Sequence, residues 1–310
     1  MTFVRPEIIR PPSEHGSYFL PLTSGCSNNT CAFCCYHGSK LRVRELDDVQ
    51  RELDAVSLYM EKGIYTPGTP EIVYAIAQRW DGRQIFLQDG DALVYPLPKL
   101  KQVLRRVNER LPSVERVAAY ATAQDILRIA PDDLRELREL KLGILYVGLE
   151  SGDDKVLKRI GKGATTDQVI EAGVRAKQAG MLTSITVLLG LGGVEGSEEH
   201  ALKTAEALNR MDPDYVGALT LTLVPGTPLY EAWRRGDFRL ITPLQSLGEL
   251  LLMVEHSNFS NCFFSSMHAS NYFAIRGWLP REKGRMVAEL KRIIASGDQS
   301  MLRPEFLRGL

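Results

Sequence analysis

The sequence predicts an α/β fold, arranged as a full or partial (β/α) TIM-type barrel of parallel strands with a C-terminal extension. Short apolar runs alternate with amphipathic, charge-rich stretches at least six times along the 310 residues. The runs are mostly continuous, as in Ile144–Leu149, which is typical of parallel strands covered by helices. A doubly wound open sheet fits the same alternation. No Ser-, Gly- or Pro-rich linker interrupts it, so we expect one domain over residues 1–310, with its core at about 15–235 and a substrate-side extension at 236–310.

Each element follows from this alternation. We expect strands at 17–23, 84–88, 116–121, 144–149, 182–189, 215–223 and 258–264. Helices are expected at 45–62, 70–80, 97–110, 131–140, 153–159, 166–179, 197–211, 243–256 and 280–295. Pro131 suits a first helical position, and Gly143 and Gly180 are placed where C-terminal caps are expected.

Charge and composition exclude several classes of protein. Lys plus Arg number 38 and Asp plus Glu number 38, so a broad nucleic-acid-binding face is not expected. Apolar residues make up 44% and charged residues 25%, which excludes wholesale disorder and a disulfide mini-protein. No apolar run approaches the roughly 18 residues that span a bilayer, and the first residues lack a secretory core. We therefore expect a cytoplasmic protein without a membrane span.

Four of the five cysteines lie within ten residues, and they point to metal or redox chemistry. Cys26, Cys31 and Cys34 have the spacing C-x4-C-x2-C, directly after the first expected strand. Active sites of parallel α/β folds gather at the carboxyl ends of strands. Three thiolates could hold three irons of a 4Fe–4S cluster and leave the fourth iron open to a small molecule.

Three other interpretations of this loop remain open. A structural zinc site would use His37 as its fourth ligand. Cys31-x-x-Cys34 would also suit a redox thiol pair, although two further cysteines crowd the loop. Inert, buried cysteines are the third alternative.

The cysteine loop resembles the signature of the radical S-adenosylmethionine (radical SAM) superfamily, C-x3-C-x-Φ-C, in which Φ is aromatic. Phe33 occupies the aromatic position, and one extra residue separates Cys26 from Cys31. The resemblance implies that the three cysteines ligate a 4Fe–4S cluster, which binds S-adenosylmethionine (SAM). An electron from a flavodoxin- or ferredoxin-like donor then produces a 5′-deoxyadenosyl radical, which abstracts hydrogen from a substrate.

Further motifs of the superfamily follow in order. Gln88, Asp89 and Gly90 stand where the family receives the amino group of SAM; a plain Asp-Gly turn is the alternative. Glu150 and Ser151 resemble its fourth-strand end, which contacts the ribose or methionine part. The alternative role of Glu150 is a salt bridge to Lys162 or Arg159.

The next two strand ends resemble the superfamily more weakly. Gly190 and Gly192 match its fifth-strand glycine motif beside the adenine, although a simple βα turn is an equal interpretation. Val224, before a Pro-Gly-Thr-Pro turn, matches the position at which the superfamily's sixth strand contacts the adenine; an ordinary connection from strand to helix is the alternative.

The segment after the seventh strand is the expected substrate side. We expect Ser266, Ser270 and Asn271 to hold the substrate and His268 to move a proton, unless they only cap and brace a loop. Cys262 is a candidate hydrogen-atom donor, with a buried structural role as its alternative.

The motifs resemble most the group of oxygen-independent coproporphyrinogen oxidase and the radical methylthiotransferases. The resemblance implies a radical SAM enzyme acting on a small molecule or peptide, with no nucleic-acid partner expected from the neutral charge. One alternative is methyl or aminocarboxypropyl transfer from SAM at the same cluster. The alternative from another class is a zinc-stabilised α/β binding protein.

Overall fold

The computed structural model describes residues 3–309, which divide into two compact units. Unit 1 holds the described residues of Met1–Asn29 together with Gly38–Tyr146 and Arg175–Met181. Unit 2 holds Thr30–His37, Val147–Val174 and the described residues of Leu182–Leu310. The chain passes between the units several times, so neither is a continuous segment. Organisation as one functional domain stays a prediction.

The fold is an eight-stranded, mostly parallel sheet with helices, as the sequence predicts. The strands, in their order across the sheet, are β1 (Tyr18–Pro21), β4 (Gln84–Gln88), β5 (Arg116–Ala121), β6 (Leu142–Glu150), β7 (Leu182–Leu189), β8 (Tyr215–Thr220), β9 (Cys262–Ser265) and β10 (Arg276–Leu279). The pairs β1–β4, β4–β5, β7–β8 and β8–β9 are parallel, and β10 is antiparallel to β9. The sheet is open, with β1 and β10 as its edges, so the arrangement is a partial barrel rather than a closed one.

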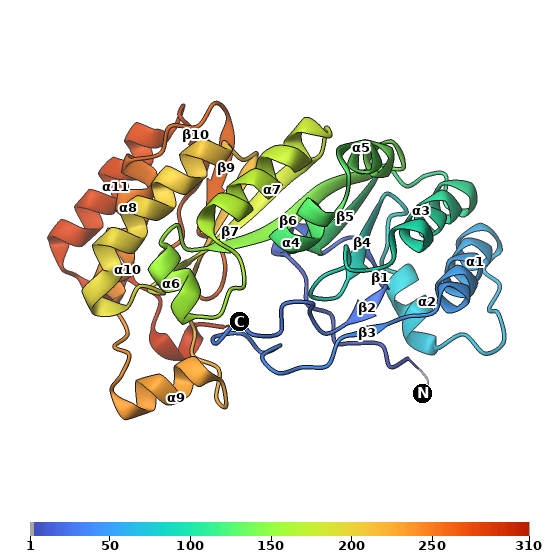
Figure 1. Cartoon of the computed structure of the whole chain (residues 1–310), viewed down its shortest axis with the longest axis horizontal. Coiled ribbons are helices and arrows are strands. Elements are labelled where there is room, and N and C mark those ends of the chain that lie inside the picture. Colours follow the sequence, from blue (N-terminus) through green and yellow to red (C-terminus); the bar gives the residue numbers. More distant parts are fainter. Residues whose placement is uncertain (1–2, 310) are drawn as a thin grey trace. The chain divides into compact units, whose positions relative to one another are not determined.

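Unit 1 contains β1, β4, β5 and the first part of β6. Its helices are α1 (Leu46–Lys62), α2 (Glu71–Ala77), α3 (Leu97–Arg110), α4 (Ala123–Arg128) and α5 (Pro131–Glu139), with the 3-10 turn η1 (Pro12–Glu14) (Figure 1). A small antiparallel ribbon pairs β2 (Thr23–Ser24) with β3 (Arg42–Val43). The expected cap at Gly143 is wrong: that residue lies inside β6, and Lys141 takes the left-handed conformation after α5.

Unit 2 contains the remaining strands and α6 (Asp154–Arg159), α8 (Gly193–Met211), α9 (Pro228–Arg235), α10 (Pro243–Glu255) and α11 (Lys283–Ser296). The short turns η2 (Gln299–Met301) and η3 (Glu305–Leu307) follow. Helix α7 (Thr166–Gln178) begins in unit 2 and ends in unit 1. Thr227 caps α9 by accepting a hydrogen bond from the Tyr230 N–H, and Pro228 occupies the first helical turn.

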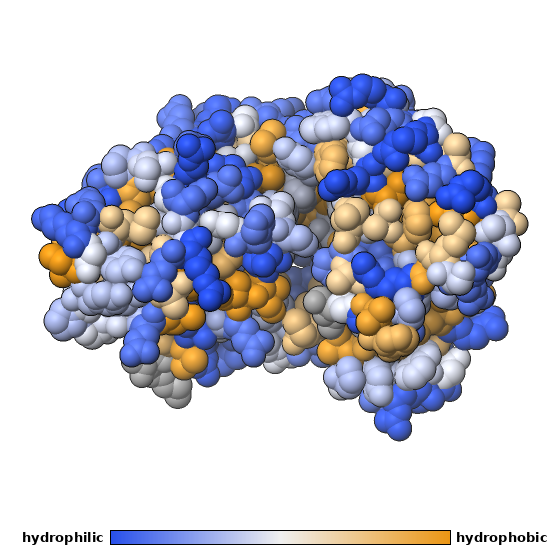
Figure 2. All heavy atoms as spheres, turned by 180° about the vertical axis from the view of Figure 1, so that it is seen from behind, coloured by the Kyte–Doolittle hydropathy of each residue, from blue (hydrophilic) through white to orange (hydrophobic). Residues whose placement is uncertain are grey.

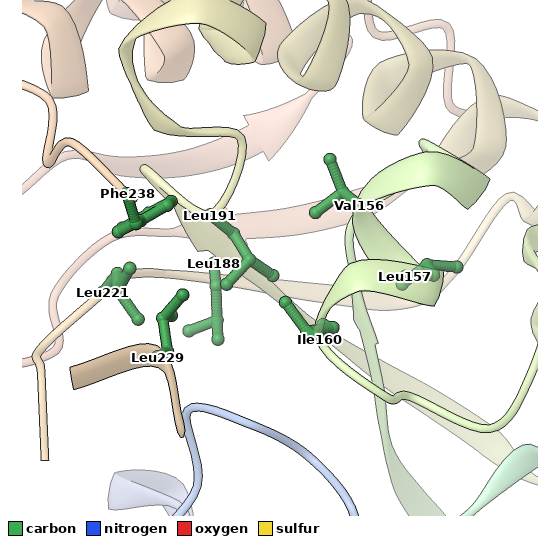
Figure 3. Close-up of a cluster of buried hydrophobic side chains, with 8 residues drawn as sticks. All are labelled: Val156, Leu157, Ile160, Leu188, Leu191, Leu221, Leu229 and Phe238. Carbon is green, nitrogen blue, oxygen red and sulfur yellow. The ribbon is translucent and has the colours of Figure 1, made fainter. Parts of the chain in front are cut away.

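A cluster of eight buried hydrophobic residues joins the ends of β7 and β8 to α6 and α9 in unit 2 (Figure 3). It contains Val156, Leu157, Ile160, Leu188, Leu191, Leu221, Leu229 and Phe238. Phe33, from the cysteine loop, packs against this cluster. Apolar burial therefore fixes the cysteine loop to the carboxyl ends of two parallel strands.

The face seen in Figure 2 carries hydrophilic residues with hydrophobic ones dispersed among them. Within residues 3–309, no helix has the length and apolar character needed to cross a membrane.

Candidate active site

In unit 2, the loop carrying Cys31 and Cys34 is held by hydrogen bonds on both sides of Ala32. The Ala32 N–H donates to the Ile160 carbonyl at 2.7 Å, and its own carbonyl accepts from the Leu229 N–H at 2.9 Å. The Cys34 N–H donates to the Cys31 carbonyl at 3.2 Å, which closes a tight turn between the two thiols. The loop is therefore anchored to the ends of α6 and α9.

Gly161 allows the same loop to approach α6 closely. Its φ is +66°, and a Cβ at this position would lie 2.7 Å from the Thr30 carbonyl oxygen. The Thr30 hydroxyl donates to the Gly161 carbonyl at 2.7 Å. A side chain at residue 161 would therefore displace the backbone that carries the cysteines.

The five cysteines are all thiols, and they differ in environment. Cys31 is 8% exposed and Cys262 is fully buried, whereas Cys35 is exposed. Burial raises the pKa of the Cys31 thiol, although the nearby Lys162 ammonium acts to lower it. A hydrogen bond with Cys35, together with burial, raises the pKa of Cys34. Cys26 lies in unit 1, where its Sγ donates to the Gly90 carbonyl at 3.9 Å.

Throughout residues 3–309, no three His, Cys, Asp or Glu side chains converge as they would around one metal ion. A 4Fe–4S cluster instead takes one thiolate per iron, so its ligands need not converge on a single point. The donor set of Cys26, Cys31 and Cys34 fits such a cluster by chemical type and by spacing along one loop.

Unit 1 places the Gln88-Asp89-Gly90 segment at the carboxyl end of β4, as expected. The Asp89 carboxylate accepts from the Gly25 N–H at 3.0 Å, which joins this segment to the residue before Cys26. Gln88 is fully buried; its amide N–H donates to the Glu7 carbonyl, while its Oε1 has no hydrogen-bond partner among the described residues. A buried acceptor without a partner is uncommon in folded proteins.

Sequence reasoning missed a buried carboxyl pair beside this segment in unit 1. The Ser27 hydroxyl oxygen lies 2.5 Å from Oδ2 of Asp91 and 3.0 Å from Oδ2 of Asp125, and Thr122 donates to Asp125 at 2.7 Å. Burial and the hydrogen bond with Asp125 raise the pKa of Asp91 well above its usual range. Burial acts to raise the pKa of Asp125 as well, but hydrogen bonds from Asp91 and Thr122 outweigh it and lower that pKa. The pair therefore favours a proton on Asp91 over one on Asp125. The place of Asp91 two residues after Asp89 was the available signal.

Glu150 ends β6 in unit 2 with a left-handed backbone, φ +63°, and its carboxylate pairs with Lys162 at 2.9 Å. Both side chains are largely buried. This is the salt bridge named above as the alternative role of Glu150. It also places an ammonium group beside the thiol of Cys31.

Ser151, the next residue, belongs to a buried network that the sequence did not reveal. Its Oγ lies 2.7 Å from Nδ1 of His200 and accepts from the Asp153 N–H at 3.0 Å. The other imidazole nitrogen, Nε2, lies 3.1 Å from the Leu188 carbonyl on β7. Burial lowers the pKa of His200 to about 4, so the ring is neutral and donates one N–H to that carbonyl.

Glu249 of α10 holds the glycine turn after β7. Its carboxylate accepts from the Gly190 N–H at 2.7 Å and from the Ser197 hydroxyl at 2.6 Å. Burial raises the pKa of Glu249 to about 7. Gly190 has a left-handed backbone, φ +85°, and a Cβ there would lie 3.1 Å from the Ile241 side chain. Gly192 has φ −65° and is the N-cap residue of α8. The expected helix start at 197 is therefore wrong, because α8 begins directly after this turn.

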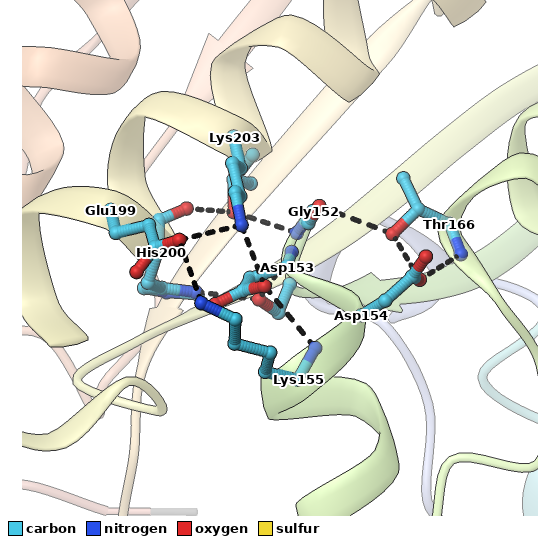
Figure 4. A network of polar contacts seen from close by, with 10 residues as sticks. Gly152, Asp153, Asp154, Lys155, Thr166, Glu199, His200 and Lys203 are labelled. Atoms are coloured by element: carbon cyan, nitrogen blue, oxygen red, sulfur yellow. Dashed lines mark hydrogen bonds and ion pairs between the residues drawn. The ribbon is translucent and has the colours of Figure 1, made fainter.

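Charged residues on α6 and α8 brace the turn that follows β6 (Figure 4). Lys203 donates to Asp153 at 3.0 Å, and Asp153 also caps α6 by accepting from the Lys155 N–H. Thr166 donates to Asp154 at 2.8 Å. These contacts tie the residues that follow Gly152 to α8 and to the start of α7.

The expected substrate residues lie together beside β8 and β9 in unit 2, but their polar atoms bond to the protein. Ser266, Ser270 and Asn271 are each at most 3% exposed. Asn271 donates to the carbonyls of Ala218 and Ser266 and accepts from a threonine hydroxyl.

His268 and Cys262 complete this part of unit 2. His268 Nδ1 lies 2.9 Å from the Ser270 hydroxyl, and burial lowers the pKa of its imidazole. Cys262 is the first residue of β9. Val224 lies in the turn before α9, and its carbonyl accepts a hydrogen bond from the Thr227 hydroxyl. The substrate and catalytic roles expected for these residues stay predictions.

Comparison with known proteins identifies the class. The model of the radical SAM superfamily matches residues 20–206. The heme chaperone HemW of Bacillus subtilis is 22% identical over 79% of this chain and 64% of its own length. A putative methylthiotransferase of Methanocaldococcus jannaschii is 24% identical over 57% of the chain and 36% of its own length.

Solved structures agree on the fold. Coproporphyrinogen III oxidase (HemN) from Escherichia coli superposes with a TM-score of 0.53 and 16% identity, over 77% of this chain and 51% of that one. Methylornithine synthase (PylB) superposes with a TM-score of 0.51 and 19% identity, over 78% of this chain and 63% of the synthase chain.

The chain belongs to the radical SAM superfamily. The predicted superfamily, the α/β fold and the assignment as an enzyme of this superfamily are confirmed. Superfamily enzymes use SAM and a 4Fe–4S cluster, and a neighbouring structure, the methyltransferase TsrM from Kitasatospora setae, contains that cluster. The chain spans less than two thirds of the length of these relatives.

Proposed function

We propose that this protein is a radical SAM enzyme that abstracts hydrogen from a small molecule or peptide, with Cys26, Cys31 and Cys34 as the cluster ligands. The observation that carries the proposal is the C-x4-C-x2-C loop within a matched radical SAM domain. When bound, the cluster supplies the electron that cleaves SAM to a 5′-deoxyadenosyl radical. A flavodoxin- or ferredoxin-like protein is the proposed electron donor.

The chain's own residues have three tasks in this proposal. The hydrogen-bonded turn at Ala32 holds Cys31 and Cys34 at a fixed separation. Asp89 and Gln88 supply acceptors for the amino group of SAM, and the unsatisfied Oε1 of Gln88 supports that role. Glu150 and Ser151 would face the ribose or methionine part.

The glycine turn at Gly190 and Gly192, with Val224, would hold the adenine. The position of this turn at the carboxyl end of β7, which pairs in parallel with β8, supports this role.

A small-molecule or peptide substrate is proposed on the balance of charge, which lacks a basic surplus. Another relative, a tRNA uridine(34) acetyltransferase of Methanocaldococcus infernus, has a name that refers to RNA; this chain covers 36% of it. A tRNA substrate is therefore the competing outcome of any substrate screen.

The neighbouring cysteines Cys34 and Cys35 offer a matched test of the cluster. Full-length protein and the variants Cys34→Ser and Cys35→Ser are reconstituted with iron and sulfide without oxygen. We expect wild type and Cys35→Ser to be brown and to absorb near about 400 nm, as thiolate-bound clusters do, and Cys34→Ser to lose most of that absorption. Colourless protein that binds one zinc would contradict the proposal and favour the zinc-stabilised alternative.

A further inference from the structure

Glu249, on α10 in unit 2, is a buried carboxyl to which the proposed function assigns no role. It is 1% exposed, and no lysine or arginine within residues 3–309 pairs with it. Nε2 of His200 lies 3.8 Å away, but burial lowers the pKa of that imidazole to about 4, so the ring carries no charge. Burying a carboxyl without a cation costs stability, and such groups are frequent at functional sites.

The carboxylate of Glu249 holds the backbone of the glycine turn after β7. One oxygen, Oε2, accepts from the Gly190 N–H at 2.7 Å, and the other, Oε1, accepts from the Ser197 hydroxyl of α8 at 2.6 Å. Hydrogen bonds to a charged acceptor are roughly twice as strong as neutral ones. Because groups from two different elements engage the two oxygens, the carboxylate has one orientation and fixes the direction of the Gly190 N–H.

A second face of the same turn borders open space. Gly190 lines a cavity of about 270 Å³ together with Leu221 and Thr222, and Glu249 is not among the lining residues in the part of the chain that the structure describes. Leu188 and Leu191, on either side of the turn, belong to the buried hydrophobic cluster (Figure 3). Glu249 would therefore act on a ligand of this cavity only through the backbone of Gly190.

A turn that receives a ligand with its backbone binds more tightly when its shape is already fixed, because less ordering is lost on binding. We propose that Glu249 is a positioning residue for SAM: it holds the Gly190 turn in the conformation that receives the adenine, and it raises the affinity for SAM without taking part in SAM cleavage. The inference rests on the proposed function, which places the adenine at this turn.

Replacements of Glu249 test whether its reach to the turn determines SAM affinity. The dissociation constant of SAM is measured by calorimetric titration of cluster-loaded, full-length protein that is not reduced, so that SAM stays intact. Glu249→Ala should raise this constant by about tenfold or more, as expected for the loss of a hydrogen bond to a charged group. Glu249→Gln should stay within about threefold of wild type, because its amide oxygen still reaches the Gly190 N–H.

Leu290→Ala, on α11, is the control for a purely structural effect, because it removes a fully buried side chain from another helix of unit 2. It should lower the thermal midpoint and leave the dissociation constant of SAM unchanged. In reduced protein, Glu249→Ala should raise the KM for SAM and keep the wild-type kcat. If Glu249→Ala does not fold, Glu249→Asp replaces it, since its shorter side chain keeps the charge but withdraws it from the Gly190 N–H.

Three results would overturn the inference. Glu249→Ala, or Glu249→Asp in its place, could bind SAM as tightly as Leu290→Ala does. Glu249→Gln could lose as much affinity as Glu249→Ala, and the loss in Glu249→Ala could be confined to kcat. Failure of the proposed function is distinguishable, because it is read in wild type alone, from cluster absorption and from the formation of 5′-deoxyadenosine.

Discussion

Replacing Glu249 by Gln should change how stability depends on pH, because this carboxyl titrates inside the protein. Its pKa rises from the ordinary 4.5 to about 7, so the folded state binds the proton more tightly than the unfolded state. The resulting stability is present below pH 4.5 and is lost as pH rises through 7. A shift of this size corresponds to about 3 kcal/mol of unfolding free energy.

His200, 3.8 Å away, has the opposite dependence. Burial lowers its pKa from 6.5 to about 4, so its contribution is present above pH 6.5 and is lost as pH falls through 4. In wild type, Glu249 makes the free energy of unfolding fall with rising pH and His200 makes it rise, so the two contributions largely cancel between pH 4.5 and 6.5. Glu249→Gln keeps only the slope of His200, so its stability should rise with pH across that interval.

Urea unfolding followed by circular dichroism, at pH values from 4.5 to 8, measures this effect. The free energy of Glu249→Gln minus that of wild type should increase by about 3 kcal/mol between pH 4.5 and 7. Glu255→Gln is the control on the same helix: its exposed carboxylate pairs with Lys291, and that partner lowers its pKa. A difference that stays constant with pH for Glu249→Gln would refute the buried, titrating carboxyl.

Two further predictions concern the packing that holds the site. Gly190→Ala should destabilise the protein by about 1–3 kcal/mol, because φ is +85° and Ile241 lies close; Gly196→Ala, within α8 and with open space around it, should stabilise by about 0.5–1 kcal/mol. Leu229→Ala should cost about 2–5 kcal/mol by opening a cavity in the cluster beneath the cysteine loop. Urea midpoints measure both; equal effects of the two glycine substitutions, or a neutral Leu229→Ala, would contradict the packing described.

Strands buried within the sheet could be predicted well from sequence. The expected ranges 84–88, 116–121 and 182–189 coincide with β4, β5 and β7. These runs are rich in apolar and β-branched residues, and flanking turns mark their ends. β10 was missed because its four residues, Arg276–Leu279, are too few to show the periodicity of a strand, and it lies at the edge of the sheet, where it pairs with β9.

Helix α9 was missed for a different reason. Pro225, Gly226 and Pro228 indicate a turn, and the turn interpretation concealed Thr227 as an N-cap with proline in the first helical turn. The start of α8 was misplaced because consecutive glycines predict a loop, whereas the helix begins at Gly193.

Sequence could propose candidate residues where a motif lies along one segment, but it could not reveal contacts between distant segments. Cys31, Cys34 and Ser151 could be proposed from local spacing. The buried partners His200 and Glu249 come from helices 49 and 59 residues away from the groups they hold, and no local pattern marks them. Ser270 and Asn271 form hydrogen bonds with backbone groups of β8 that their local sequence does not indicate, and their proposed substrate role stays a prediction.

The central claim is that this chain uses SAM for radical chemistry, and the cleavage product tests it most directly. Iron-loaded, chemically reduced protein is incubated with SAM without oxygen, and the nucleosides are separated by chromatography. We expect 5′-deoxyadenosine from wild type and none from Cys34→Ser. Methylthioadenosine as the only product would indicate aminocarboxypropyl transfer, and intact SAM with fully loaded, reduced wild type would contradict the claim.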